Sequence, residues 1–247
     1  MPLGFAPFEL WILSILSFSC LIYLLDSLDW RQSFYVCFCF GLGYWVVGIS
    51  WVYVSIHYHG NIDMISSLLI TSAFIFCLSL YTGTVGLLYK KLSKESNFNA
   101  VLLFPICWFM VEVIRSYLFT GFPWLIVGTV LSGSVFDGWI SIIGAQGNSL
   151  ILATLSGCIF IAFNNRKKIT TLLPSVSIIA VIFISSLCLK TVNWTSPLEE
   201  IKVTAYQPNL TLSDKWSYKG IAKTKLLMET AVAESQNSEI VVFPETA

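Results

Sequence analysis

Six long stretches of this chain carry almost no charged residues, and this feature limits the possible folds more than any other. Each is long enough to cross a bilayer, because a helical span needs about 20 mostly apolar residues. The expected helices are residues 8–25, 33–55, 64–89, 98–118, 138–163 and 171–190. A mean hydropathy of +0.77 and a charged fraction of 11% exclude an ordinary soluble domain. The sequence therefore predicts an α-helical, multi-pass membrane bundle.

Charged side chains are concentrated in the last part of the chain. Residues 196–247 hold 12 of the 28 acidic and basic side chains in about a fifth of the length. This shift predicts a transmembrane domain over residues 1–195 and a polar domain over residues 196–247. The formal net charge is zero and the basic residues are scattered, so we predict no nucleic-acid partner.

Lysine and arginine fall in alternate loops between the expected helices. Loops rich in these residues stay on the cytoplasmic side of a membrane. The basic residues are Arg31 in the first loop, Lys90, Lys91 and Lys94 in the third, and residues 166–168 in the fifth. We therefore expect both chain ends to face outward. An outward N-terminus in turn predicts a further helix upstream of residue 1.

Neither cysteine nor histidine forms a convincing chemical site. All seven cysteines fall within apolar spans, where a free thiol behaves as a small hydrophobe, so we assign them to packing. His57 and His59 are the only histidines, with Asp63 the nearest carboxylate. Since a metal would need further ligands, we interpret this pair as interfacial polar residues. No metal site and no cofactor are expected.

Glu112 and Arg115 are the notable charged residues inside a predicted span. Residues three apart share one face of a helix, and a charge within a membrane is costly unless it is paired. The favoured interpretation is a structural ion pair between these two side chains. A polar site that faces lipid headgroups is the alternative.

The segment TGFPW, residues 120–124, follows the fourth expected helix. Glycine and proline end a helix, and Pro123 biases Phe122 away from the helical region. We expect an exposed aromatic loop there. Phe122 and Trp124 are either anchors in the headgroup layer or residues that hold a lipid substrate.

The polar tail has the pattern of a strand, a helix and a second strand. Residues 201–206 alternate as in a strand, residues 216–234 have helix-forming composition, and residues 240–243 form a short apolar run. This order predicts a parallel βαβ unit, with Glu245 just beyond the carboxyl end of a strand. Spacing alone would make Glu245 a solvated turn carboxylate, but its position favours a functional role. Two strands and one helix are too few to bury a core, which predicts an incomplete domain.

Several segments together carry a family resemblance. They are GISWVYVSI (48–56), LSLYTG (78–83), residues 112–115, TGFPW (120–124) and FPETA (243–247). With them the chain resembles bacterial apolipoprotein N-acyltransferase over its whole length. Residues 4–7 resemble the segment after the family's first transmembrane helix. The resemblance thus implies a chain truncated at both ends.

The resemblance implies a multi-pass enzyme of the bacterial inner membrane with a periplasmic, nitrilase-like α-β-β-α domain. Such an enzyme moves an acyl chain from a phospholipid to the N-terminal S-diacylglyceryl-cysteine of an apolipoprotein. The family triad is Glu, Lys and Cys, in which the carboxylate serves as general base for the thiol. Glu245 matches this base. Trp216 matches a tryptophan associated with the active site.

The matching Lys and Cys would lie beyond Ala247, so the resemblance implies a chain that is inactive alone. Two alternatives follow. One is a split acyltransferase, in which a second polypeptide supplies the rest of the nitrilase-like domain. The other is a non-catalytic membrane module that binds lipid, or a relic.

Overall fold

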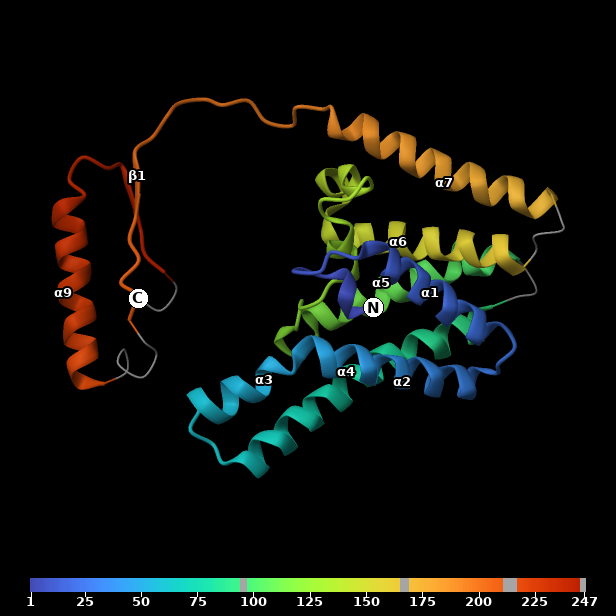
Figure 1. The fold of residues 1–247 in the computed structure, drawn as a ribbon, viewed down its shortest axis with the longest axis horizontal. Helices are drawn as coiled ribbons and strands as arrows, with labels where there is room; N and C mark the ends of the chain where they lie inside the picture. Colours follow the sequence, from blue (N-terminus) through green and yellow to red (C-terminus); the bar gives the residue numbers. More distant parts are fainter. Residues whose placement is uncertain (94–96, 165–168, 211–216, 245–247) are drawn as a thin grey trace. The chain divides into compact units, whose positions relative to one another are not determined.

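A computed structural model describes residues 1–93, 97–164, 169–210 and 217–244 of the chain (Figure 1). Its internal contacts define two compact units. The larger unit comprises Met1–Val54 and Asp63–Trp194, and the smaller one comprises Ser55–Ile62 and Thr195–Ala247.

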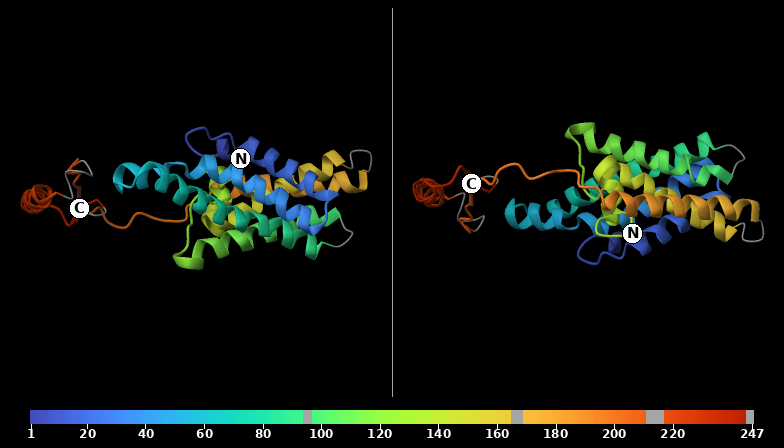
Figure 2. Two further views of the ribbon diagram at one scale, coloured as in Figure 1. Left: turned by 90° about the horizontal axis from the view of Figure 1, so that it is seen from below. Right: turned by 90° about the horizontal axis from the view of Figure 1, so that it is seen from above.

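The larger unit is a bundle of helices that lie lengthwise beside one another (Figure 2). Its longer helices are α1 (Trp11–Asp26), α2 (Trp30–Ile49), α4 (Met64–Leu92), α5 (Leu103–Tyr117), α6 (Ile140–Asn164) and α7 (Ile169–Lys190). The helices at α2, α4, α5, α6 and α7 are long and apolar enough to cross a membrane, whereas α1 is shorter. The predicted helical membrane bundle is therefore confirmed.

Short helical segments connect these helices. They are η1 (Pro2–Gly4), α3 (Trp51–Val54), the π-helical turn η2 (Ser55–His59), η3 (Asn97–Ala100), η4 (Leu118–Thr120), η5 (Val127–Leu131) and η6 (Asp137–Trp139). The expected span 33–55 is thus divided, since α2 ends at Ile49. The expected helix over 98–118 begins later, at Leu103, because Pro105 has no N–H and fits only the first turn of a helix.

The core of the bundle lies where α1, α5 and α6 meet. Phe18 of α1 is fully buried, and its ring centroid lies 4.4 Å from that of Trp108 and 5.6 Å from that of Phe104, both on α5. On the α6 side, the Ser19 hydroxyl donates to the Ser156 carbonyl at 2.9 Å. Aromatic packing and one buried hydrogen bond thus fix α1 against both neighbours.

Small residues let α2 and α4 approach closely. A Cβ atom placed on Gly86 of α4 would lie 2.3 Å from the Ser33 carbonyl oxygen and 2.7 Å from the Cys37 sulfur of α2. Close approach through small side chains is the usual means by which membrane helices associate. This explains why glycine occupies a position inside a helix, where it is otherwise unfavourable.

Gly86→Ala is expected to lower the free energy of unfolding by about 2 kcal/mol, because the added methyl group meets backbone that cannot move aside. Gly43→Ala is the matched control, since nothing lies within 4 Å of a Cβ placed there. Unfolding of the purified protein in mixed detergent, followed by circular dichroism, measures both. Equal stability of the two variants would contradict close contact at Gly86.

The smaller unit contains a parallel pair of strands joined by a helix. Strand β1 (Val203–Ala205) pairs with β2 (Ile240–Val242) in the register Val203 to Ile240, and α9 (Tyr218–Glu234) connects them. The Ser217 hydroxyl accepts a hydrogen bond from the Gly220 N–H at 2.9 Å and caps α9. The βαβ unit predicted from the order of the tail is confirmed.

Candidate functional site

The backbone after α5 has an unusual conformation. Phe119, Thr120 and Leu125 have φ values of 54°, 70° and 51°, and Gly121 has a φ of 79°. A left-handed conformation is unfavourable for residues that carry a Cβ, so tertiary contacts must hold this segment. We call residues 118–126 the TGFPW loop. The loop predicted from Gly121 and Pro123 is present.

Arg115 holds the TGFPW loop from inside the bundle. Its guanidinium is buried and donates hydrogen bonds to the carbonyl oxygens of Phe122 and, at 2.8 Å, of Trp124. The same group lies over the indole ring of Trp45, 4.9 Å from its centroid. One planar cation thus fixes the two carbonyls on either side of Pro123.

Glu112 holds the segment that follows the loop. Its carboxylate is buried and accepts hydrogen bonds from the Val127 N–H at 2.9 Å, from the Ser149 hydroxyl and from the Trp108 indole at 3.4 Å. These donors belong to η5, α6 and α5. The carboxylate therefore joins three segments at one buried point.

Glu112 and Arg115, for which the sequence suggests a structural ion pair, make no direct ion-pair contact in the part of the chain that the structure describes. Among the described residues, the ion pairs join Lys190 to Asp137 and Lys225 to Glu229. Glu112 and Arg115 lie on the same side of α5, but each is satisfied by hydrogen bonds to other segments. A buried charge needs hydrogen-bond partners, and here the loop and α6 supply them.

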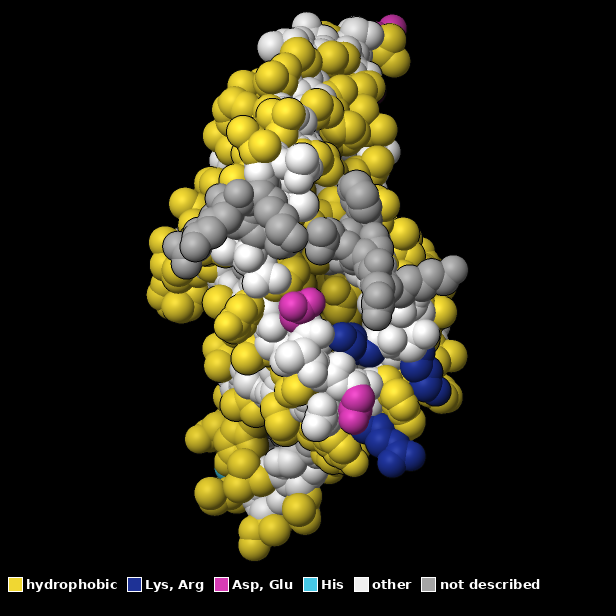
Figure 3. Space-filling model, turned by 90° about the vertical axis from the view of Figure 1, so that its right-hand side faces the viewer, with side chains coloured by type: hydrophobic (Ala, Val, Ile, Leu, Met, Phe, Trp, Pro, Cys, Tyr) yellow, Lys and Arg dark blue, Asp and Glu magenta, His cyan; other side chains and the backbone are white. Residues whose placement is uncertain are grey.

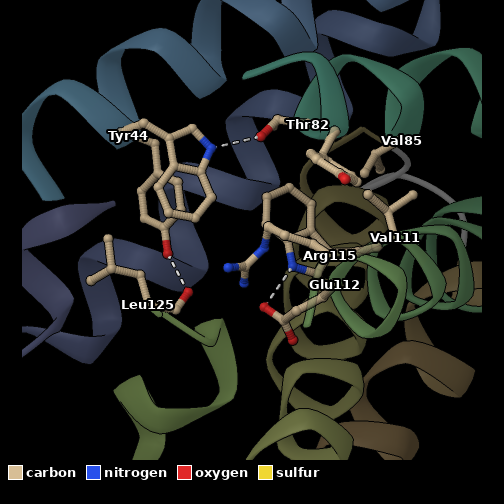
Figure 4. Close-up of a pocket in the computed structure, with 10 residues that line it drawn as sticks. Tyr44, Thr82, Val85, Val111, Glu112, Arg115 and Leu125 are labelled. Atoms are coloured by element: carbon tan, nitrogen blue, oxygen red, sulfur yellow. Dashed lines mark hydrogen bonds between the residues drawn. The ribbon is translucent and has the colours of Figure 1, made fainter. Parts of the chain in front are cut away.

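Two further contacts complete this framework (Figure 4). The Tyr44 hydroxyl donates to the Leu125 carbonyl at 2.7 Å, and the Trp45 indole donates to the Thr82 hydroxyl at 3.2 Å. These residues line a cavity of about 20 Å³ together with Glu112 and Arg115. The cavity has room for a single water molecule.

A larger apolar groove of about 700 Å³ opens between α4 and the TGFPW loop. Its size is within the range of small-molecule sites. The groove is lined by Phe74, Cys77, Leu78, Leu80, Tyr81 and Thr84 of α4, by Arg115, and by Leu118, Phe119, Thr120, Gly121 and Phe122. A hydrocarbon chain is the ligand that this lining would accept most readily.

The two predicted aromatic residues of the loop take different positions. Phe122 lines the groove, and its ring centroid lies 5.0 Å from that of Phe74. Trp124 is 50% exposed, and its nearest aromatic partner is Trp51 at 5.5 Å. Phe119, which the sequence analysis did not single out, is 85% exposed at the rim of the groove.

Glu245 and Trp216 lie outside the described residues. His57 is described, and one of its ring nitrogens lies 2.8 Å from the Ile62 carbonyl oxygen.

Sequence reasoning missed the residues of α6 that support the loop. The Ser149 hydroxyl accepts from the Gly128 N–H at 2.8 Å while donating to Glu112. The Asn148 side chain donates to the Gly128 carbonyl at 3.1 Å. A signal was present, because Asn148 and Ser149 interrupt an apolar span, and buried polar residues in a span usually have a partner.

Comparison with known proteins identifies the family of the chain. Residues 1–158 match the family described as apolipoprotein N-acyltransferase N-terminal domain. A protein of Coxiella burnetii named apolipoprotein N-acyltransferase is 32% identical over 250 residues, covering 100% of this chain and 51% of that protein. A protein of Shewanella oneidensis with the same name is 32% identical over 257 residues, covering 99% of this chain and 47% of that protein. The chain spans about half the length of these curated relatives, and it belongs to the apolipoprotein N-acyltransferase family.

Proposed function

We propose that this chain forms the membrane part of an apolipoprotein N-acyltransferase. The reaction transfers an acyl chain from a phospholipid to the N-terminal S-diacylglyceryl-cysteine of an apolipoprotein. Family membership supports the class of reaction. The observation that carries the proposal for these residues is the apolar groove beside the TGFPW loop, because it offers a place for the acyl chain of a membrane lipid.

In the proposed reaction, Glu245 is the general base. In the sequence it comes three residues after β2, and open α/β folds keep their sites beyond the carboxyl ends of strands. A carboxylate there would take the proton of a cysteine thiol, and the thiolate would attack the phospholipid ester to give a thioester. A lysine and backbone donors would stabilise the oxyanion, and the lipoprotein amine would then accept the acyl group.

The groove would hold the acyl chain of the phospholipid donor, with Phe122 in its wall and Trp124 at the headgroup level. Arg115 and Glu112 act as positioning residues, since they fix the loop that forms this wall. Trp216 is proposed to contact substrate from the polar domain, residues 196–247. This domain is proposed to be nitrilase-like and to lie on the periplasmic side of the inner membrane, as the basic loops predict.

Leu80→Trp is expected to reduce labelling by a phospholipid with a photoreactive acyl chain about fivefold, because the indole would fill the groove that Leu80 lines. Leu69→Trp is the matched control, since Leu69 lies on the same helix with its side chain exposed and does not line the groove. Mass spectrometry of the labelled peptides locates the crosslinks. Labelling of Leu80→Trp equal to that of the control would exclude the groove as the acyl site.

We also propose that these 247 residues do not catalyse the transfer by themselves. The seven cysteines lie on α1, α2, α4, α5, α6 and α7: Cys37, Cys107 and Cys158 are buried, whereas Cys20, Cys39, Cys77 and Cys188 are exposed on helix surfaces. All seven therefore precede β1 and β2 in the sequence, and none follows a strand of the smaller unit, where the proposed nucleophile would be needed. The lysine and cysteine of the triad would have to come from elsewhere.

The purified 247-residue polypeptide is therefore expected to give no transfer to a diacylglyceryl peptide above the rate without protein. Thin-layer separation of a fluorescent product measures this. Transfer by the polypeptide alone would contradict the proposal that these residues are inactive by themselves. Activity restored by a second polypeptide carrying the remaining sheet would favour the split enzyme over a lipid-binding module.

A further inference from the structure

Three cationic side chains gather at the end of the bundle where α2 begins and α4 ends. Asp29 caps α2, because its carboxylate accepts hydrogen bonds from the Arg31 N–H at 2.8 Å and the Gln32 N–H at 2.9 Å. The Gln32 side chain accepts from the Asp29 N–H in return. This capping box fixes the first turn of α2 and with it the position of Arg31.

The other two cations come from the last turn of α4. The Lys91 ammonium lies 4.7 Å from the centroid of the Trp30 indole, and the Arg31 guanidinium lies 5.0 Å from the same centroid. The Lys90 ammonium donates to the Asp26 carbonyl at 3.0 Å. Two helices thus direct their cations to one aromatic ring, which is 40% exposed.

Among the described residues, the nearby carboxylates Asp26 and Asp29 form no ion pair with these cations. Asp29 is occupied by the cap, and no ion pair within the described residues involves Arg31, Lys90 or Lys91. Two positive charges near one ring repel each other, and an anion bound between them would offset this repulsion. Figure 3 shows basic side chains, in dark blue, gathered on one part of this end of the molecule beside acidic ones in magenta.

An apolar groove of about 530 Å³ begins one helical turn from Arg31. It runs between α1 and α2 and is lined by Leu24, Tyr35, Cys39 and Phe40, among others. Arg31 and Tyr35 are four residues apart and therefore share one side of α2. The groove lies outside the site at the TGFPW loop, since no residue lines both.

We propose that this end of α2 and α4 is a binding site for an anionic phospholipid, distinct from the acyl-donor groove. The guanidinium of Arg31 and the ammonium of Lys91 would share the two charged oxygens of the lipid phosphodiester, while Trp30 lies at the headgroup level. The groove beside Tyr35 takes one acyl chain. The groove favours a lipid over a free phosphate ion, because a phosphate ion has no apolar part that could bind there.

The test compares retention of phosphatidylglycerol and phosphatidylcholine with identical chains by the detergent-purified 247-residue protein, measured by native mass spectrometry. Wild-type protein is expected to retain phosphatidylglycerol several-fold better. Arg31→Gln with Lys91→Gln is expected to weaken this retention about tenfold, because each cation near a headgroup contributes substantially. Lys219→Gln with Lys223→Gln removes the same charge from exposed positions on α9 and is expected to leave it unchanged.

Two further arms identify the ligand and its chain. Cys39→Trp leaves the cations in place but fills the groove, and it is expected to reduce retention of phosphatidylglycerol. Inorganic phosphate and glycerol 3-phosphate are expected to compete only weakly. Equal retention of the two lipids, an unchanged double variant, or equally tight binding of a soluble phosphate would each overturn the proposal. Circular dichroism and size-exclusion profiles confirm that every variant is folded.

Discussion

Arg115→Gln is expected to lower the free energy of unfolding of the bundle by about 3 kcal/mol and to release the TGFPW loop. The guanidinium donates to the carbonyls of Phe122 and Trp124, and a hydrogen bond that involves a charged group contributes about 1.5–3 kcal/mol. Glutamine is too short to reach both. Arg115→Lys is expected to recover only part of the loss. An ammonium lacks the planar arrangement of donors that reaches two carbonyls at once, and it stacks less well on Trp45.

Two measurements separate the loop from overall stability. Unfolding in mixed detergent gives the free energy, and the rate of chymotrypsin cleavage after Phe119 or Trp124 reports the release of the loop. Arg31→Gln, tested in lipid-free detergent, is the matched control at an exposed arginine. If Arg115→Gln left both readouts unchanged, the guanidinium would not hold the loop.

Gly128→Ala is expected to destabilise the bundle by about 3 kcal/mol or more. A Cβ atom on Gly128 would lie 1.9 Å from the Ala145 carbonyl oxygen and 2.4 Å from the Ser149 nitrogen, both of them backbone atoms of α6. Neither can rotate away, so η5 itself would have to move. Its movement would also break the hydrogen bonds of Gly128 to Asn148 and Ser149.

This variant should disturb the loop as well as the fold. Glu112 accepts from Val127 of η5, and Ser149 of α6, which also donates to Glu112, accepts from Gly128 of η5. Displacement of η5 therefore removes one donor to the carboxylate and one partner of the other donor. Chymotrypsin cleavage after Phe119 or Trp124 is expected to become faster than in Gly43→Ala, where the added methyl group is free of contacts. A Gly128→Ala protein as stable as that control would show that η5 is not held against α6.

The bundle and the βαβ unit were predictable from the sequence because their signals are local and repeated. An apolar stretch of membrane length has few alternatives to a helix, since every backbone group must be satisfied within the bilayer. In the tail, the order of a strand, a helix and a strand leaves a parallel crossover as the simple solution, and β1 and β2 form it. The limits of the two domains, residues 1–195 and 196–247, stay a prediction.

The partners of Glu112 and Arg115 were not predictable in the same way. Their spacing places them on one side of α5, which suggests a pair, but helix spacing carries no information about what packs against that side. The actual partners are backbone groups of the TGFPW loop and η5 and a serine of α6, 37 residues from Glu112. Only the tertiary arrangement brings these groups within hydrogen-bond distance.

The helices of the bundle differ widely in length, and this has a consequence for the surrounding bilayer. α1 has 16 residues and α4 has 29, which correspond to about 24 Å and about 44 Å at the usual rise per residue. The hydrocarbon layer is about 30 Å thick. The bilayer must therefore become thinner beside α1, whereas α4 must tilt or extend past the hydrocarbon layer. The bilayer around the protein is thus uneven in thickness. A thicker membrane would increase the hydrophobic mismatch at α1 and reduce it at α4.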